Sequence, residues 1–377
     1  MENNFNFDTE TLLTSSLIVV VASLLAGIFA VYYLIQYFNQ KQLFDLPDDD
    51  RKTHKIPTPS SGGLVFSIPV VAMMIYLFFI GQNSIYIFSS LLLIFVGFID
   101  DRRDLSAKLK LVFQMLVACL AIVELGPVNI FGESMYWLNT ITTVLFIAGF
   151  TNAFNLIDGS DGLAGTYALV VFVAFSTVFI LQGQHLWALY TLSVCGMLVA
   201  FLKFNWRPAK IFMGDTGSLF LGFSIVFMGV KAVKGFEHTA DNYWILLFGL
   251  LFLPVVDTIR VMGVRMAKGR SPLKADRSHL HHLLEKIGLK EHEIVLFFMI
   301  TSFLFALETY FLVKMGARTI TAVLSLILSA SILLNGLIFI RLKQHKKRVE
   351  GYIKSLSLLA EENQLLFRKY KLKTHKS

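Results

Sequence analysis

Long apolar runs recur along the whole chain and are separated by short polar stretches. Each run is close to the roughly 20 residues that a helix needs to cross the hydrocarbon of a membrane. The pattern therefore predicts an all-α, polytopic membrane protein with about eleven transmembrane helices. The predicted spans are 13–38, 62–80, 84–99, 109–126, 138–156, 163–181, 186–203, 217–233, 243–263, 293–313 and 318–341.

The composition points to the same class of protein. Hydrophobic residues make up 55% of the 377 residues, and charged residues only 16%. A soluble domain has roughly 25% charged residues, so this composition excludes a disordered chain, a collagen, a secreted disulfide scaffold and an ordinary cytosolic enzyme. The two cysteines, Cys119 and Cys195, lie inside apolar runs. They give no indication of a metal cluster or of a redox compartment.

Lys and Arg residues gather in every second polar stretch. With residue 1 placed outside, 30 of the 34 basic residues fall in inner stretches. Because basic loops favour the cytoplasmic side of a membrane, we expect the N-terminus outside and the C-terminal tail in the cytoplasm. The net charge of +8 then divides into +12 inside and −4 outside. The inner stretches are 39–61, 100–110, 203–210, 260–290 and 341–377.

The charge pattern divides the sequence into an integral membrane domain, 1–341, and a basic tail, 342–377. The tail mixes charged and apolar residues, which is compatible with an amphipathic helix on an anionic membrane surface. Because the basic residues lie at membrane ends, we do not expect nucleic-acid binding. The polar loops expected to carry the chemistry on the cytoplasmic side are 39–61, 100–108, 155–163, 204–216 and 264–292.

Two adjacent carboxylates, Asp100 and Asp101, follow the third predicted span. Such a pair can bind a divalent cation or act as a base, and repulsion between the two charges raises one pKa. A solvated loop edge, neutralised by Arg102 and Arg103, explains the pair equally well. Lys110 lies at the start of the next predicted span, close to this loop.

Amides and acids three residues apart follow in the chain: Asn152, Asn155, Asp158 and Asp161. On a helix this spacing places neighbouring side chains on one slowly drifting face. Such a face suits a metal ion, a ribose or the edge of a base, whereas a polar helix cap is the simpler alternative. The stretch 138–202 contains no Lys or Arg, so the two acids need a counter-charge from other loops or from a bound cation.

A third acidic site opens the eighth predicted span, where Asp215 lies between Gly214 and Gly217. Backbone amides at a helix N-terminus form an anion site. A carboxylate there would hold a hard cation such as Mg²⁺, which uses few protein carboxylates together with substrate phosphates. An ordinary helix N-cap is an equally good explanation of Asp215 when it is taken alone.

A His-x-His-His cluster lies among basic residues in the loop 264–292 and could bind zinc or phosphate. Zinc ligands rarely crowd among so many cations without cysteine or acidic partners, so a phosphate-binding patch fits better. A second basic group precedes the second predicted span. The residues concerned in these two groups are Arg270, His279, His281, His282, Lys52 and His54.

All these polar groups fall on the predicted inner side of the membrane. Charge at membrane spans is costly and so needs a functional reason. Acids, amides and many cations on one face indicate phosphate chemistry with a divalent metal, because phosphoryl transfer needs mainly positioning and charge neutralisation. The setting at a membrane surface indicates that one substrate is a lipid.

At this point the motifs match a known family. The stretch from about 41 to 290 resembles the polyprenyl-phosphate N-acetylhexosamine-1-phosphate transferases, a type of glycosyltransferase family 4. All the motifs occur in the family's order and on one predicted membrane face. They are Arg51-Lys52-x-His54-x4-Pro59-x2-Gly62-Gly63, Asp100-Asp101, Asn155-x2-Asp158-Gly-x-Asp161-Gly, Met213-Gly-Asp215-x-Gly-Ser218 and His279-Leu-His281-His282.

The resemblance implies that a sugar 1-phosphate moves from a UDP-sugar to undecaprenyl phosphate, with release of UMP. Mg²⁺ is the implied cofactor, with Mn²⁺ as an alternative, and Asp215 and Asn155 are its implied ligands. The implied catalytic residues are Asp100 and Asp101, which would activate the lipid phosphate, and His279. The residues expected to bind nucleotide, phosphate and sugar are Asn152, Asp158, Asp161, Lys110, Lys52, His54, Arg270, His281 and His282.

The segment from Ser278 to His282 is similar to the UDP-N-acetylglucosamine branch of that family, which starts O-antigen, teichoic-acid and related envelope glycans. UDP-MurNAc-pentapeptide, UDP-FucNAc and UDP-QuiNAc remain alternative donors. The resemblance places the protein in the inner or plasma membrane with a cytoplasmic active site, and it also suggests a homodimer. From the residues alone, a secondary transporter with acids that bind ions, or a membrane scaffold with a basic tail, remains open.

Overall fold

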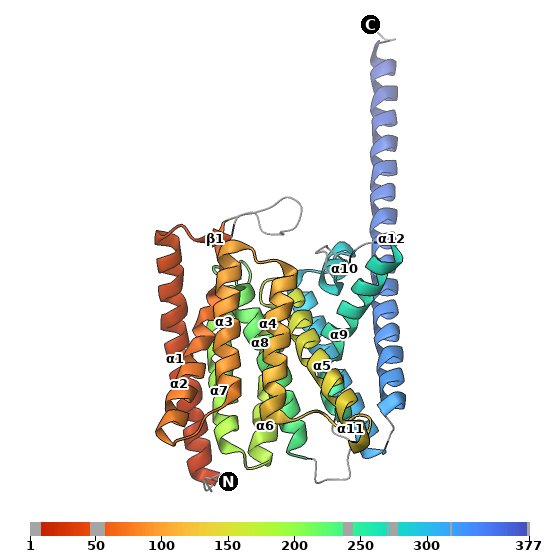
Figure 1. Ribbon diagram of the computed structural model, residues 1–377. Coiled ribbons are helices and arrows are strands. Elements are labelled where there is room, and N and C mark those ends of the chain that lie inside the picture. Colours follow the sequence, from red (N-terminus) through yellow and green to blue (C-terminus); the bar gives the residue numbers. More distant parts are fainter. Residues whose placement is uncertain are drawn as a thin grey trace. The chain divides into compact units, whose positions relative to one another are not determined.

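The computed structural model describes residues 9–45, 57–236, 244–269, 271, 278–316 and 319–374. The chain divides into two compact units, 1–322 and 323–377. Helices make up almost all of the described residues, and the expected all-α class is therefore confirmed (Figure 1). One antiparallel strand pair, β1 (Phe44–Asp45) and β2 (Thr58–Pro59), sets Phe44 opposite Pro59.

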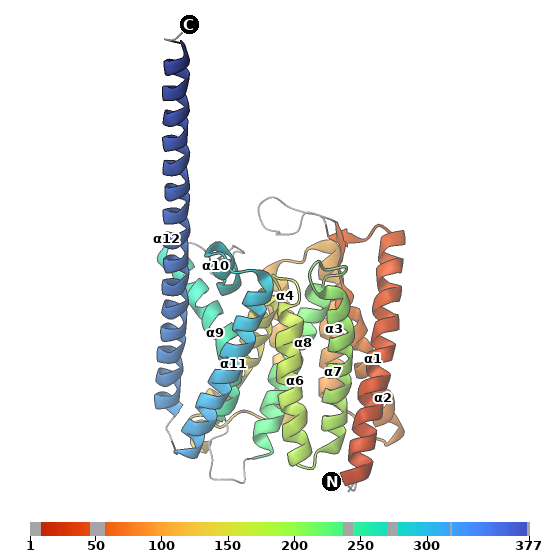
Figure 2. The same cartoon turned by 180° about the vertical axis from the view of Figure 1, so that it is seen from behind.

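Most of the helices of the first unit run along one bundle (Figure 2). Residues 84–99 and 109–126, which were predicted as spans, form most of α3 and α4. Short 3-10 helices, η1 (Gly62–Phe66) and η2 (Glu133–Met135), precede α2 and α5. The α-helices are α1 (Thr9–Gln40), α2 (Ser67–Phe79), α3 (Ile85–Arg103), α4 (Ala107–Leu125), α5 (Tyr136–Ile157), α6 (Leu163–Leu181), α7 (His185–Asn205), α8 (Gly214–Lys234), α9 (Trp244–Ala267), α10 (Leu280–Lys286), α11 (Glu291–Lys314) and α12 (Thr319–Thr374).

Eight helical segments among the described residues are long and apolar enough to cross a membrane. The protein is therefore a multi-pass membrane protein. The predicted spans 84–99 and 109–126 lie on helices whose ends are charged, and the span 318–341 falls on α12. The count of eleven spans remains a prediction. The short helix α10 was not expected, because the sequence indicated only a polar loop at 264–292.

The helix α8 lies at the centre of the bundle and packs against α3, α5 and α6. Almost every residue from Thr216 to Val233 is buried, which explains why this helix carries so many small residues. A Cβ on Gly63 would overlap the backbone of Gly217, so η1 and the first turn of α8 approach closely. In the same way, a Cβ on Gly97 of α3 would overlap the backbone of Asp215. The absence of side chains at these glycines thus lets η1 and α3 pack closely against the first turn of α8.

The helices α3, α5 and α9 end, and α8 begins, at one end of this bundle, which is uppermost in Figure 1. The segment from β2 to η1 is hydrogen-bonded to the residues that precede α8: the Gly62 and Gly63 amides donate to the Phe212 and Met213 carbonyls. The Phe212 amide donates to the Pro59 carbonyl in return. This end of the bundle is therefore braced by segments that are far apart in the sequence.

Candidate active site

A polar cavity of about 360 Å³ opens at this end of the bundle. Its lining brings together the acids of the three sequence motifs that precede α9. The lining residues are Asp45, Ser60, Asp100, Asp101, Asp104, Asn155, Asp158, Gly159, Ser160, Asp161, Asn205, Phe212, Met213, Gly214, Asp215, Ser218 and His282. Five carboxylates that the sequence singled out, Asp100, Asp101, Asp158, Asp161 and Asp215, thus share one cavity.

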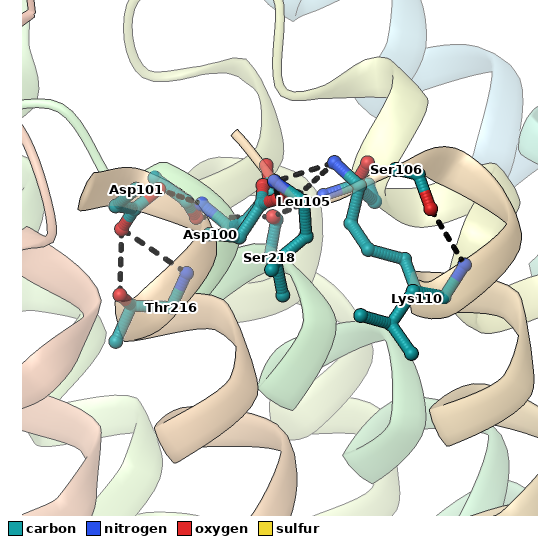
Figure 3. A network of polar contacts seen from close by, with 11 residues as sticks. Asp100, Asp101, Leu105, Ser106, Lys110, Thr216 and Ser218 are labelled. Carbon is teal, nitrogen blue, oxygen red and sulfur yellow. Dashed lines mark hydrogen bonds and ion pairs between the residues drawn. The ribbon is translucent and has the colours of Figure 1, made fainter. Parts of the chain in front are cut away.

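The carboxylate of Asp101 caps the N-terminus of α8 from the neighbouring helix α3 (Figure 3). Its Oδ1 accepts a hydrogen bond of 2.7 Å from the Asp215 amide, and its Oδ2 accepts one of 2.6 Å from the Thr216 hydroxyl. The Thr216 amide donates to the same Oδ2 at 3.3 Å. The amides at a helix N-terminus lack partners within the helix and favour an anion. A Cβ on Gly214, whose φ is +71°, would overlap this carboxylate.

Lys110 of α4 contacts two acids of the cavity, Asp100 and Asp215 (Figure 3). Its Nζ is 2.9 Å from Asp100 Oδ2 and 2.8 Å from Asp215 Oδ2. The Leu105 amide, in the turn between α3 and α4, donates to Asp100 Oδ1 at 2.7 Å. One lysine therefore offsets two carboxylates that belong to different helices.

Asn155 on α5 is hydrogen-bonded to Ser218 in the first turns of α8, the helix that carries Asp215. Its Nδ2 donates to Ser218 Oγ at 2.8 Å, and this hydroxyl donates to the Gly214 carbonyl at 3.0 Å. Asn155 and Asp215 thus line the same cavity from two adjacent helices. Within the part of the chain that the structure describes, no group of three or more His, Cys, Asp or Glu side chains could hold a metal ion.

The loop after α5 is fixed by two acceptors. Asp161 Oδ2 accepts from the Ala209 amide at 3.1 Å. Asn205, at the end of α7, accepts from the Gly162 amide at 3.0 Å and donates to the Ile211 carbonyl at 2.9 Å. Together, these three bonds tie the loop to the end of α7 and to the segment that leads into α8. They fix the position of Asp158, which lies between Asn155 and Asp161.

Burial in this loop raises the pKa of Asp158 well above its ordinary value, and the nearby carboxylates of Asp215, Asp101 and Asp161 raise it further. A raised pKa means that the surrounding protein disfavours the charged form. The carboxylates of Asp215, Asp101 and Asp161 contribute negative potential at Asp158 in addition to the effect of burial. A cation or a cationic side chain would be attracted to such a site, which is the arrangement that suits a divalent metal carrying phosphates.

The histidine cluster is organised by Asp257 of α9. Its Oδ2 lies 2.9 Å from His279 Nδ1, and its carboxylate accepts from the Leu280 amide at 3.0 Å. Arg260 contacts the same carboxylate at 2.7 Å and also donates to the Ser278 carbonyl at 2.6 Å. The acid therefore fixes the start of α10. Asp257 thus contacts both Arg260, three residues further along α9, and His279.

Comparisons with known proteins identify the family of this chain. The family model described as "Glycosyl transferase family 4" matches residues 83–233. A relative of Bacillus subtilis (strain 168), named "Probable undecaprenyl-phosphate N-acetylglucosaminyl 1-phosphate transferase", is 32% identical over 270 residues, which are 69% of this chain and 74% of the relative. The chain belongs to glycosyl transferase family 4.

Two further relatives carry the name "Undecaprenyl-phosphate alpha-N-acetylglucosaminyl 1-phosphate transferase". The relative of Escherichia coli (strain K12) is 28% identical over 298 residues, which are 73% of this chain and 79% of the relative. The relative of Yersinia pestis is 30% identical over 274 residues, which are 68% and 73% of the two chains. The family expected from the sequence motifs is therefore confirmed, and so is the N-acetylglucosaminyl branch within it.

For this family 4 member, the structure places some expected site residues away from the cavity. His279 and His281 are only 4% and 2% exposed and do not line it, whereas His282 does. A Cβ on Gly159 would overlap the ring of His281, so this ring lies directly behind the loop that carries Asp158. Asn152, one turn before Asn155, is half-buried but does not line the cavity either. These three side chains therefore lie outside the cavity lining, and their roles stay predictions.

Burial lowers the pKa of His281 to about 3, with the neighbouring rings of His282 and His279 contributing. The ring is therefore neutral near pH 7 and offers no positive charge to a phosphate. Within the described residues, neither ring nitrogen of His281 has a hydrogen-bond partner. The His281 ring lies against Gly159, and His282 is the histidine of this cluster that lines the cavity.

Three expected substrate-binding residues, Lys52, His54 and Arg270, lie outside the described residues. The sequence, in turn, did not single out Ser60, Asp104 and Phe212, which line the cavity. Phe212 directly precedes the Met213-Gly-Asp215 motif, so its closeness to a known motif was the available signal. Ser60 and Asp104 are polar residues in turns and carried no such signal.

Proposed function

We propose that this protein transfers N-acetylglucosamine 1-phosphate from UDP-N-acetylglucosamine to undecaprenyl phosphate and releases UMP. The observation that carries the proposal is the contact of Lys110 with both Asp100 and Asp215, inside a cavity at one end of the membrane bundle. The names of relatives from Bacillus subtilis and Escherichia coli state this kind of transfer. The product would be the lipid-linked diphosphate sugar with which an envelope glycan begins, such as O-antigen or the linkage unit of teichoic acid.

The reaction exchanges one phosphorus–oxygen bond for another. An oxygen of the lipid phosphate attacks the phosphorus that carries the sugar, and the bond from this phosphorus to UMP breaks, so that UMP departs with the electron pair. Both partners are anions, so catalysis consists mainly of positioning and charge neutralisation. Lys110 supplies a fixed positive charge at the acid cluster. Asp100, which lines the cavity, is the proposed acceptor of a proton from the lipid phosphate.

The proposed cofactor is Mg²⁺, with Mn²⁺ as the alternative. Mg²⁺ prefers oxygen ligands and uses one or two carboxylates together with substrate phosphates. Asp215 and Asn155 fit this requirement, because both line the cavity and belong to adjacent helices that Ser218 links. When bound, the ion would neutralise the diphosphate and stabilise the departing UMP. Asp158 and Asp161, on the loop that follows α5, would then face the nucleotide.

The proposed orientation follows from the basic residues. Eleven spans with the N-terminus outside would place the cavity, the histidine cluster and the C-terminal tail in the cytoplasm, where UDP-sugars occur. The membrane would be the inner or plasma membrane. The acids lie where α3 and α5 end and α8 begins, rather than midway along these helices. A secondary transporter would instead need its ion ligands near the middle of the membrane.

A donor comparison with the purified protein tests the proposal. Labelled UDP-N-acetylglucosamine, UDP-MurNAc-pentapeptide, UDP-FucNAc and UDP-QuiNAc are each incubated with undecaprenyl phosphate and Mg²⁺. We expect labelled lipid from UDP-N-acetylglucosamine, and no labelled lipid when Mg²⁺ is chelated. Asp215→Asn should abolish the product, whereas Glu133→Gln, at an exposed residue outside the cavity, should retain it. The absence of lipid-linked product with all four donors would contradict the proposed function.

A further inference from the structure

A second cavity, of about 460 Å³, adjoins the polar cavity of the candidate active site. Asp161 lines both cavities. Trp206 and Arg207, in the segment between α7 and α8, form one wall of the second cavity, and Glu291, the first residue of α11, lies in another. The loop that carries Asp161 therefore lies beside two parts of the chain to which the proposed reaction gives no role.

The segment between α7 and α8 contacts this loop directly. The Ala209 amide donates a hydrogen bond of 3.1 Å to Asp161 Oδ2. The Trp206 indole lies over Gly162, because a Cβ on that glycine would be 3.1 Å from the ring. One carboxylate oxygen of Asp161 is therefore bonded to the backbone of this segment. The position of Asp161 in the polar cavity depends on where residues 206–209 lie.

An ion pair connects the same segment to α11. Arg207 Nη1 contacts Glu291 Oε1. Exposed ion pairs contribute little to stability, but the Glu291 side chain is only 15% exposed. Its Oε2 is buried and has no hydrogen-bond partner in the part of the chain that the structure describes. Removal of Arg207 would leave a largely buried carboxylate without this counter-charge, which is the costly way to break an ion pair.

The histidine cluster contacts the same loop at its other end. The ring of His281, on α10, lies against Gly159. A short connection, residues 287–290, joins α10 to α11, where Glu291 lies. Two successive helices thus hold the loop 158–162 at two places. One contact is direct, at Gly159, and the other passes through Arg207 to Asp161.

We propose that Arg207 and Glu291 form a positioning pair that sets the place of Asp161 and thereby the affinity for the uridine nucleotide of the donor. This inference rests on the proposed function, in which Asp161 faces the nucleotide. Neither side chain of the pair lines the polar cavity, so the pair acts through the loop. Loss of the pair should weaken donor binding, whereas the transfer step, assigned to Lys110 and Asp100, should change little.

Steady-state kinetics of the purified full-length chain separate these effects. Arg207→Ala and Glu291→Ala are compared with Lys203→Ala, which removes an exposed cation from the last turn of α7, outside both cavities. Each pair variant should raise the KM for UDP-N-acetylglucosamine about tenfold, within the range of coupling in one ion-pair network. The inhibition constant of UMP, which reports binding alone, should rise by the same factor. The kcat and the KM for undecaprenyl phosphate should match those of Lys203→Ala.

A charge exchange tests whether the two side chains act together. Arg207→Glu places two acids side by side and should weaken donor binding further. Arg207→Glu/Glu291→Arg restores opposite charges and should recover part of the affinity, although a cation is disfavoured at the N-terminus of α11. Arg207→Lys keeps the positive charge and should retain most of the affinity. Melting temperatures of all variants show that each one is folded.

The route through Asp161 is tested by combining two changes. Asp161→Ala should raise the same two constants, the KM for the donor and the inhibition constant of UMP. Arg207→Ala should then add little in the Asp161→Ala background, because its effect passes through that carboxylate. Effects that simply multiply would overturn the proposal and would indicate that Arg207 contacts the donor itself.

Three further results would overturn the positioning pair. Donor KM and UMP inhibition constants equal to those of Lys203→Ala would show that the pair does not influence the nucleotide. A lower kcat with both constants unchanged would mean that it acts on the transfer step. A folded exchange variant that binds UMP no better than Arg207→Glu would show that the two side chains do not act as a pair. The absence of labelled lipid with the unchanged protein would instead contradict the proposed function, and the role of the pair with it.

Discussion

The Asp101 carboxylate holds Thr216 at the first turn of α8 through both the hydroxyl and the amide of that residue. A third bond reaches the amide of Asp215 itself. Asp101 therefore fixes the residue that we propose as the metal ligand. Both of its oxygens accept hydrogen bonds from these donors, so we expect its effect on the reaction to pass through the position of Asp215. Of the adjacent acids, Asp100 is the one that contacts Lys110.

Asp101→Asn should lower both stability and activity. The carboxylate accepts hydrogen bonds from three donors, and the side-chain amide of Asn replaces one of its acceptor oxygens with another donor. Leaving buried donors without an acceptor costs about 1–3 kcal/mol each. Thr216→Val removes one of the bonds and should have a smaller effect of the same kind, whereas Thr216→Ser keeps the hydroxyl and serves as the control. Thermal unfolding and transfer rates are measured together. If Asp101→Asn abolished activity with an unchanged melting temperature and Thr216→Val had no effect, Asp101 would act as a catalytic group instead.

Lys110→Met should reduce the rate constant for transfer about 100-fold or more, which is typical for the loss of one fixed electrostatic group at a reacting centre. The variant leaves Asp100 and Asp215 without the cation that separates them. Lys110→Arg keeps the charge and should retain part of the activity. Rates at saturating donor, measured over a range of Mg²⁺ concentrations, provide the comparison. Equal rates for Lys110→Met and the unchanged protein would exclude Lys110 from the site.

Gly159→Ala should impair the enzyme, because the added methyl group overlaps the His281 ring. Overpacking of this kind costs about 1–3 kcal/mol. His281→Ala removes the ring, so the double variant should be less impaired than the sum of the two single changes predicts. A double-mutant cycle on transfer rate and on thermal stability measures this coupling. Strict additivity would mean that the two residues do not touch.

The stability of the protein should fall with acidification through His281. Its pKa is lowered to about 3 in the folded protein, so below about pH 6.5 the unfolded state takes up a proton that the folded state does not. The contribution is lost at up to about 1.4 kcal/mol per pH unit between pH 6.5 and 3. Melting temperatures in detergent at pH 7.5 and pH 5 should therefore differ more for the unchanged protein than for His281→Phe. Equal differences would show that His281 titrates normally.

Apolar runs and charge asymmetry predict the membrane class well, because both arise from local composition. Acids lie where α3 and α5 end and where α8 begins, and the sequence drew attention to them because a charged residue is conspicuous in an apolar chain. The sequence could not show which acid does what. Asp101 and Asp100 are neighbours in the chain, yet one caps α8 and the other contacts Lys110.

The histidine cluster illustrates the same limit. His279, His281 and His282 are close in sequence, and their motif suggested a common phosphate-binding role. Their burial depends on how α9, α10 and the loop at Gly159 pack, which is tertiary information. Asp257 anchors His279, and Gly159 leaves room for His281. Only His282 reaches the cavity lining.

The fate of the phosphorus that carries the sugar tests the central proposal most directly. UDP-N-acetylglucosamine is prepared with one label on the sugar and a second on the adjacent phosphorus, and is incubated with the protein, undecaprenyl phosphate and Mg²⁺. The account predicts that both labels enter the lipid in equal amounts while unlabelled UMP is released. Transfer of the sugar label alone, with the labelled phosphorus leaving as UDP, would contradict the proposed reaction.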